Sequence, residues 1–178
     1  MGQVEFSITD DVPRGTTDRE IAKVQNGGNS AFMSELYFHY SRYLMISSSV
    51  CGKLPANLQG KWNEEICPAW KSDYHFDTNL QMNYWMAEPC GLSACTEALF
   101  RYIEKFYEKA ALDLYSCRGI LLSIQTDAWT RATPELFVWI GATLQIAQYF
   151  LDALPLHGRS PISKGKSVST FCKSSRIL

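Results

Sequence analysis

Three polar side chains at alternate positions, His75, Asp77 and Asn79, are the best candidates for chemistry in this chain. Alternate side chains of an extended segment point to the same side, so this spacing predicts an imidazole, a carboxylate and a carboxamide on one face of a cleft. Such a group can bind sugar hydroxyls, or hold a water molecule for attack on an anomeric carbon. In the alternative interpretation, His75 and Asp77 cap the helix that follows, because a helix N-terminus favours an acidic side chain.

The surrounding segment, residues 54–85, is rich in tryptophan and in uncharged amides. A sugar ring has an apolar C–H face and a rim of hydroxyls, so its binding site needs flat aromatic rings and hydrogen-bonding groups together. The segment therefore predicts one wall of a carbohydrate site, with Trp62, Trp70 and Trp85 as stacking platforms. Each of these tryptophans, taken singly, is also a candidate core residue.

A second loop, residues 116–133, contains Asp127 beside Trp129. Asp127 either lines the same cleft or only caps a turn of its own loop, and the sequence leaves both interpretations open.

Helices joined by long loops are expected to position these residues. Apolar spacing, capping residues and a first-turn proline predict helices over 32–48, 79–88, 93–115 and 134–153, and a capping box of Thr17 with Glu20 predicts a short one before them. The connection over residues 50–78 is long enough to suggest a functional loop, and a short extended run is expected near residues 120–124. The pattern predicts an all-α fold, and its long aromatic-rich loops are typical of an α/α toroid.

Composition bounds the class of protein. The chain has 178 residues, of which 46% are hydrophobic and 13% aromatic, which predicts a folded domain. No apolar run reaches 18 residues, so we expect no membrane partner. The six cysteines form no CxxC pair and the three histidines lie far apart, so we expect no structural zinc site. No apolar run follows Met1, so the protein is expected either to be intracellular or to lack its true beginning, and the compartment stays open.

The ends of the chain differ from its middle. We expect residues 1–31 to form a lead-in segment with one short helix. Residues 157–178 carry five basic side chains and no acidic one, and they are rich in serine. We expect a solvated, disordered tail there. A basic tail can also bind nucleic acid or anionic lipid, but the excess of acidic residues in the rest of the chain opposes a nucleic-acid partner.

Three long motifs identify a family resemblance. The runs LPANLQGKWN (residues 54–63), WKSDYH (70–75) and NLQMNYW (79–85) together resemble glycoside hydrolase family 95, which comprises α-L-fucosidases acting on 1,2-linked fucose and some α-L-galactosidases. The resemblance extends back to residues 17–20 and forward through QTDAW (125–129) to about residue 146.

The resemblance implies an (α/α)6 barrel, of which residues 32–156 would form a part, and an inverting mechanism on a fucosylated oligosaccharide without a metal or cofactor. In that mechanism a glutamate is the general acid, and two asparagines, polarised by a distant aspartate, hold the attacking water. The family's His-x-Asn-x-Asn pattern falls on His75, Asp77 and Asn79. Asn79 is thus expected to hold water and His75 to recognise the sugar, whereas Asp77 replaces an asparagine and is a candidate base.

Nothing in this sequence matches the family's general acid or its distant aspartate, which follow the point where the resemblance stops. Inverting hydrolysis needs two carboxyl functions about 6.5–9.5 Å apart. We therefore predict a fragment of a fucosidase-like catalytic domain that is inactive alone. The alternative is a non-catalytic carbohydrate-binding or interaction module.

Overall fold

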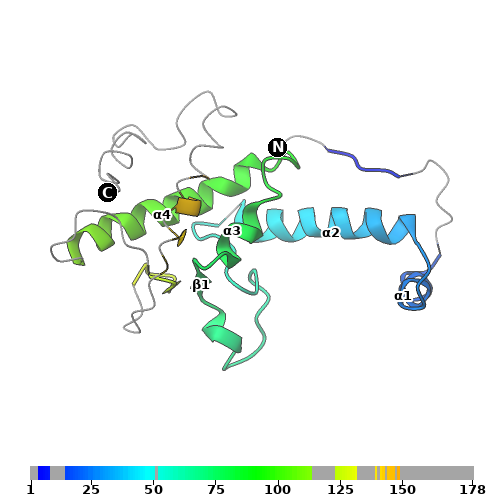
Figure 1. The fold of residues 1–178 in the computed structure, drawn as a ribbon, viewed down its shortest axis with the longest axis horizontal. Coiled ribbons are helices and arrows are strands. Elements are labelled where there is room, and N and C mark those ends of the chain that lie inside the picture. The colour runs from blue at the N-terminus through cyan, green and yellow to red at the C-terminus, as the bar shows by residue number, and fades with distance from the viewer. Residues whose placement is uncertain are drawn as a thin grey trace.

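The computed structural model describes residues 4–8, 15–50, 52–113, 123–131, 139, 141–142, 144–146 and 148, and all statements below concern these residues. This part of the chain is mostly helical, as the all-α prediction requires (Figure 1). Its elements are α1 (Thr17–Gln25), α2 (Ala31–Ser49), the 3-10 helix η1 (Ala69–Ser72), β1 (Tyr74–His75), α3 (Asn79–Tyr84), α4 (Ser93–Asp113) and β2 (Gln125–Thr126).

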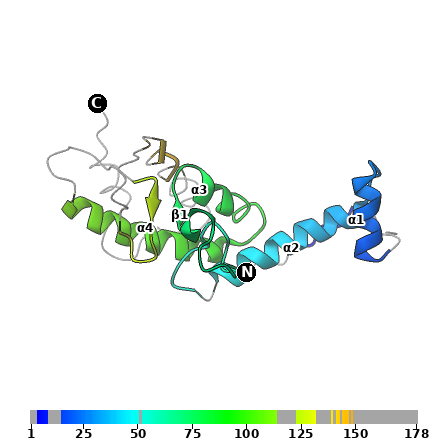
Figure 2. The same ribbon diagram turned by 90° about the horizontal axis from the view of Figure 1, so that it is seen from below.

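Helices α1 and α2 meet at Ser30. The Ser30 hydroxyl accepts a hydrogen bond from the Met33 N–H (3.2 Å) and so caps α2. The same hydroxyl donates to the Glu20 carboxylate (2.5 Å), so Glu20 reaches forward to α2. The predicted capping box is therefore wrong, since the N-cap of α1 is Thr16, without a side-chain capping bond. In both views α1 lies at the far end of α2, away from α4 (Figures 1 and 2).

Helix α4 contributes more buried apolar residues to the core than any other described element. Cys95, Leu99, Ile103 and Phe106, which are spaced along one face of this helix, are all buried. Tyr102 is buried as well, and its ring lies 4.6 Å from that of Tyr74 and 6.5 Å from that of Phe76, measured between centroids. The aromatic side chains of β1 and its following turn thus fasten the 52–78 loop to α4.

Helix α3 begins at Asn79 as predicted but ends at Tyr84, and residues 85–91 form turns. The Trp85 N–H bonds to the Met82 carbonyl (3.3 Å), three residues back, which is the tightened geometry of a helix end. The Tyr84 hydroxyl accepts from the Ala56 N–H (2.8 Å) and bonds to the Ser49 hydroxyl (2.8 Å), so α3 is joined to α2 and to the loop.

The two short strands pair in antiparallel fashion, with Tyr74 opposite Thr126 and His75 opposite Gln125. The extended run expected near 120–124 lies mostly outside the described residues, and the strand itself occupies Gln125–Thr126. This pairing brings two loops together that are separated by α3 and α4.

The helix expected over 134–153 lies largely outside the described residues, and the expected tail lies wholly outside them. Residues 141–142, 144–146 and 148 are helical, and Ala142 and Ile146 are buried in the core. Among the described helices, none combines the length and the apolar character needed to cross a bilayer.

Candidate functional site

His75 is the centre of a buried polar group. The residue is 6% exposed, its Nδ1 pairs with the Asp73 carboxylate, and its Nε2 lies 2.8 Å from the Gln125 amide nitrogen. Burial raises the pKa of Asp73, while the neighbouring His75 and Lys71 act in the opposite direction. The β1–β2 pairing is what places Gln125 opposite the imidazole. Neither Asp73 nor Gln125 was a candidate from sequence, although Asp73 stands at the same two-residue spacing from His75 as Asp77 does.

The chain is strained on both sides of this group. Trp70, Lys71 and Ser72 have φ of 54°, 58° and 49°, Thr78 has 91° and Thr130 has 61°; these are all the left-handed non-glycine residues in the described part of the chain. Each such residue costs on the order of 1–3 kcal/mol, and such strain gathers at functional sites. The strained turn leaves Trp70 69% exposed, with its ring edge-on to His75 at 5.6 Å between centroids.

His75, Asp77 and Asn79 do not lie along one extended segment, so that part of the prediction is wrong. The strand ends at His75, and a turn over residues 76–78 leads into α3 at Asn79. The turn exists because the Phe76 ring is fully buried against Tyr102 and Phe106, which bends the chain inward after the strand. Consequently His75 is buried, whereas Asp77 and Asn79 are exposed at the start of α3. Neither His75 nor Asp77 occupies the N-cap position, which belongs to Thr78.

Trp62 lies over a tight turn formed by residues 57–60. Gly60 has a φ of 68°, and a Cβ there would lie 2.8 Å from the Trp62 ring, so both the backbone and the ring require glycine. The Leu58 N–H donates to the Asp73 carbonyl (3.1 Å), which joins this turn to the His75 group. Trp62 is 47% exposed and faces solvent with part of its indole.

Two of the uncharged amides in residues 54–85 hold local turns. The Asn57 side chain accepts from the Gln59 N–H (2.9 Å) and the Asn63 side chain bonds to Glu65, so both stabilise their own turns. Within the described residues, the buried Gln59 Oε1 and the buried Ser72 Oγ have no hydrogen-bond partner. Buried polar atoms are nearly always paired, so these two atoms, which both belong to the loop over residues 52–78, are exceptions.

Trp85 lies in a different place from Trp62 and Trp70. It is 57% exposed and lines a pocket of about 280 Å³ together with Pro89, Phe100 and Gln145. None of the residues that line this pocket belongs to the His75 group. The structure thus separates the three tryptophans into two regions.

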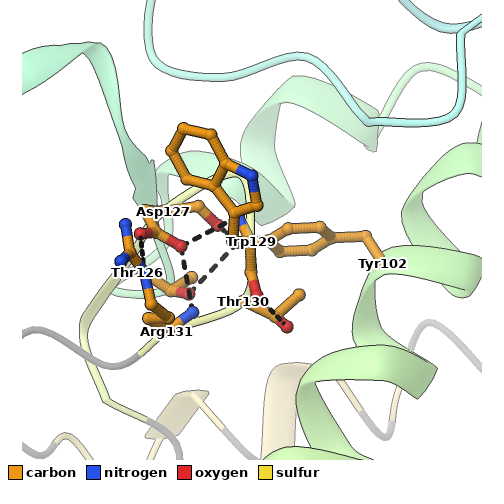
Figure 3. Close-up of polar contacts among 6 residues, drawn as sticks. All are labelled: Tyr102, Thr126, Asp127, Trp129, Thr130 and Arg131. Carbon is orange, nitrogen blue, oxygen red and sulfur yellow. Dashed lines mark hydrogen bonds and ion pairs between the residues drawn. The ribbon is translucent and has the colours of Figure 1, made fainter.

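Asp127 organises its own loop (Figure 3). Its Oδ1 accepts from the N–H groups of Trp129 (2.9 Å) and Arg131 (3.0 Å), and its Oδ2 pairs with the Arg131 Nε (2.7 Å). Partial burial disfavours the charged form, but these donors prevail and hold the pKa of Asp127 below its usual value. The capping interpretation of Asp127 therefore describes its contacts in this structure.

Trp129 is exposed beside this loop, and sequence reasoning did not select it as a site residue. It is 67% exposed, and the Arg131 guanidinium lies over its ring at 5.2 Å from the centroid. The sequence signal that could have identified Trp129 was its position two residues after Asp127 in an aromatic loop. Across the described residues, no three His, Cys, Asp or Glu side chains gather as ligands for a metal ion.

Comparison with known proteins gives a consistent result. The family model described as "Glycosyl hydrolase family 95 catalytic domain" matches residues 1–153. The chain is 43% identical over 102 residues to a protein named probable alpha-fucosidase A from Aspergillus niger, covering 56% of this chain and 13% of that protein. It is 36% identical over 132 residues to a protein named alpha-L-fucosidase 2 from Arabidopsis thaliana, covering 72% of this chain and 16% of that protein. The chain thus spans less than a fifth of the length of either relative.

Proposed function

Because this chain belongs to the glycosyl hydrolase family 95 catalytic domain family, we propose that it forms part of an (α/α)6 barrel of an inverting α-L-fucosidase. The substrate class is a fucosylated glycan, with the fucose in 1,2 linkage. The observation that carries this proposal is Trp70, an exposed indole on a strained turn, set edge-on against the buried His75. A rigid, exposed aromatic face next to hydrogen-bonding groups is what the C–H face of a sugar requires.

The exposed residues at the start of α3 take the chemical roles. Asn79 holds the attacking water, and Asp77, as a carboxylate in place of an amide, acts as the base. Trp62 extends the stacking surface from the neighbouring turn. Trp85, in its separate pocket, contacts a more distant part of the glycan, and Asp127 contributes by holding Trp129 in place.

His75 takes part in sugar recognition under one constraint. Both of its ring nitrogens already have partners within the chain, Asp73 and Gln125. A sugar hydroxyl must therefore share Nε2 with the Gln125 amide or replace it.

We further propose that the chain alone binds the glycan without cleaving it. A general acid needs a raised pKa so that it is protonated near neutral pH. The pKa of Asp127 is lowered, and its carboxylate is engaged with Arg131. Asp73 has a raised pKa, but its side chain is largely buried against His75. Neither residue is suited to protonate a leaving glycosidic oxygen.

The test is a binding titration of the full chain with 2′-fucosyllactose, with lactose as the reference sugar and a parallel assay for free fucose. We expect saturable binding of the fucosylated sugar only, lost in Trp70→Ala and retained in Tyr37→Ala, which removes an equally exposed aromatic ring from α2. A folded chain that does not distinguish the two sugars would refute recognition of the fucosyl group. Release of fucose that disappears in Asn79→Ala would refute the claim that the chain lacks turnover.

A non-catalytic interaction module is the second candidate, favoured by one surface. Tyr37, Tyr40 and Tyr43 recur every three residues on α2 and are 75%, 55% and 55% exposed, with the last two rings stacked at 6.0 Å. If this surface binds a protein partner or a second copy, Tyr40→Ser should weaken self-association in sedimentation experiments. Sugar binding should then stay unchanged.

A further inference from the structure

We propose that Asp73 is a positioning residue that fixes the tautomer of His75, with the proton on Nδ1 and Nε2 left as a hydrogen-bond acceptor. The consequence for sugar recognition rests on the proposed function. The tautomer itself does not, because it can be measured in the absence of any sugar.

Only one neutral tautomer of the imidazole satisfies both of its contacts. An amide nitrogen can only donate, so the Gln125 Nε2 at 2.8 Å requires an unprotonated His75 Nε2. A neutral imidazole carries its proton on the other nitrogen, which here faces the Asp73 Oδ1. An ionised carboxylate can only accept, so Asp73 matches that N–H.

The surroundings leave the imidazole little freedom to turn. His75 is buried, the Trp70 ring meets it edge-on, and the β1–β2 pairing holds the backbone opposite Gln125. Asp73 is itself held, because its carbonyl accepts from the Leu58 N–H (3.1 Å). The ring orientation therefore depends on the Asp73 side chain rather than on solvent.

The fixed tautomer selects what the site can bind. An acceptor Nε2 favours a ligand group that donates, such as a sugar hydroxyl, which would take over the place of the Gln125 amide. Asp73 would thus act on recognition through His75 without touching the sugar.

The experiment is long-range ¹H–¹⁵N NMR of the histidine rings in the full ¹⁵N-labelled chain. The chain contains three histidines, so His75→Gln assigns the His75 signals by their loss. In the neutral ring, we expect Nδ1 to show the shift of a protonated nitrogen and Nε2 that of an unprotonated one. Asp73→Leu, which keeps the branching at Cγ but removes the acceptor, should move the proton to Nε2. Asp18→Asn, which removes a fully exposed carboxylate on α1, should change nothing.

A proton on Nε2 in the unmodified chain, or an imidazole unaffected in folded Asp73→Leu, would overturn the proposal. Gln125→Glu gives a second reading if Asp73→Leu does not fold, since a carboxylate facing Nε2 should draw a proton onto that nitrogen. If the tautomer is as proposed but no fucosylated sugar binds, only the proposed function fails. If sugar binds while the tautomer is the opposite one, only this inference fails.

Discussion

Removing the hydroxyl of Tyr102 should loosen the loop that contains Asp127 and Trp129. The Tyr102 side chain is 1% exposed, and its hydroxyl donates to the Asp127 carbonyl (2.7 Å) and lies 3.2 Å from the Thr126 hydroxyl oxygen. Figure 3 shows the ring reaching from α4 to this loop. The bond is therefore a direct link between the core helix and the second loop of the candidate site.

Tyr102→Phe keeps the ring and its contacts with Tyr74 and Phe76, so the change isolates the hydroxyl. Thr126 is fully buried, and the substitution leaves the Asp127 carbonyl without this donor and the Thr126 hydroxyl without this hydrogen-bond partner. An unsatisfied buried partner costs about 1–3 kcal/mol. We expect the free energy of unfolding to fall by that amount, with Trp129 becoming more accessible to a fluorescence quencher.

Urea unfolding followed by circular dichroism gives the free energy, and acrylamide quenching reports on the tryptophans. Tyr37→Phe is the matched control, because it deletes the same atom from a ring that is 75% exposed, and a change within about 0.5 kcal/mol is expected there. Thr126→Val in the background of Tyr102→Phe should cost less than it does alone. Equal stability of Tyr102→Phe and Tyr37→Phe would refute the reasoning, since the hydroxyl would then contribute nothing to holding the loop.

Two further predictions concern pH and the Trp62 turn. Burial raises the pKa of Tyr84 to about 12, so its contribution to stability is complete below pH 10 and is lost as the pH rises towards 12, at about 1.4 kcal/mol per pH unit. Burial likewise raises the pKa of Tyr74 to about 12 and that of Cys95 to about 11. Thermal melts from pH 8 to 12 should therefore show falling stability, with a shallower slope in Tyr84→Phe. A melting temperature that does not change with pH would contradict this prediction. Gly60→Ala should cost about 1 kcal/mol or more, because φ is 68° and the new Cβ would meet the Trp62 ring, and a change in tryptophan emission should accompany it. Unchanged stability and emission would show that the turn tolerates a side chain.

The helices were predictable from sequence because burial of one helix face requires apolar residues at helical spacing, and that spacing is visible in the local sequence. The helix expected over 93–115 is found at Ser93–Asp113, and the one expected over 32–48 at Ala31–Ser49. The start of α3 at Asn79 was also read correctly. The loop motifs over residues 54–85 led to the family, which the match over residues 1–153 confirms.

Local signals were less reliable where a side chain had a choice of partners. The Thr17–Glu20 pattern was typical of a capping box, yet Glu20 bonds to Ser30, because the start of α2 offers it a hydroxyl. The alternate spacing of His75, Asp77 and Asn79 suggested an extended segment, yet the burial of Phe76 in the aromatic core turns the chain after His75.

The sequence by itself determined which residue types are available near the site: the tryptophans, the amides and the carboxylates. Only the tertiary structure decided which of them meet. The pairing of His75 with Gln125 joins positions fifty residues apart, and it depends on how both loops pack on Tyr102 of α4. Such a contact leaves no periodic trace in either loop, because it is fixed by the packing of distant segments rather than by the spacing of neighbours.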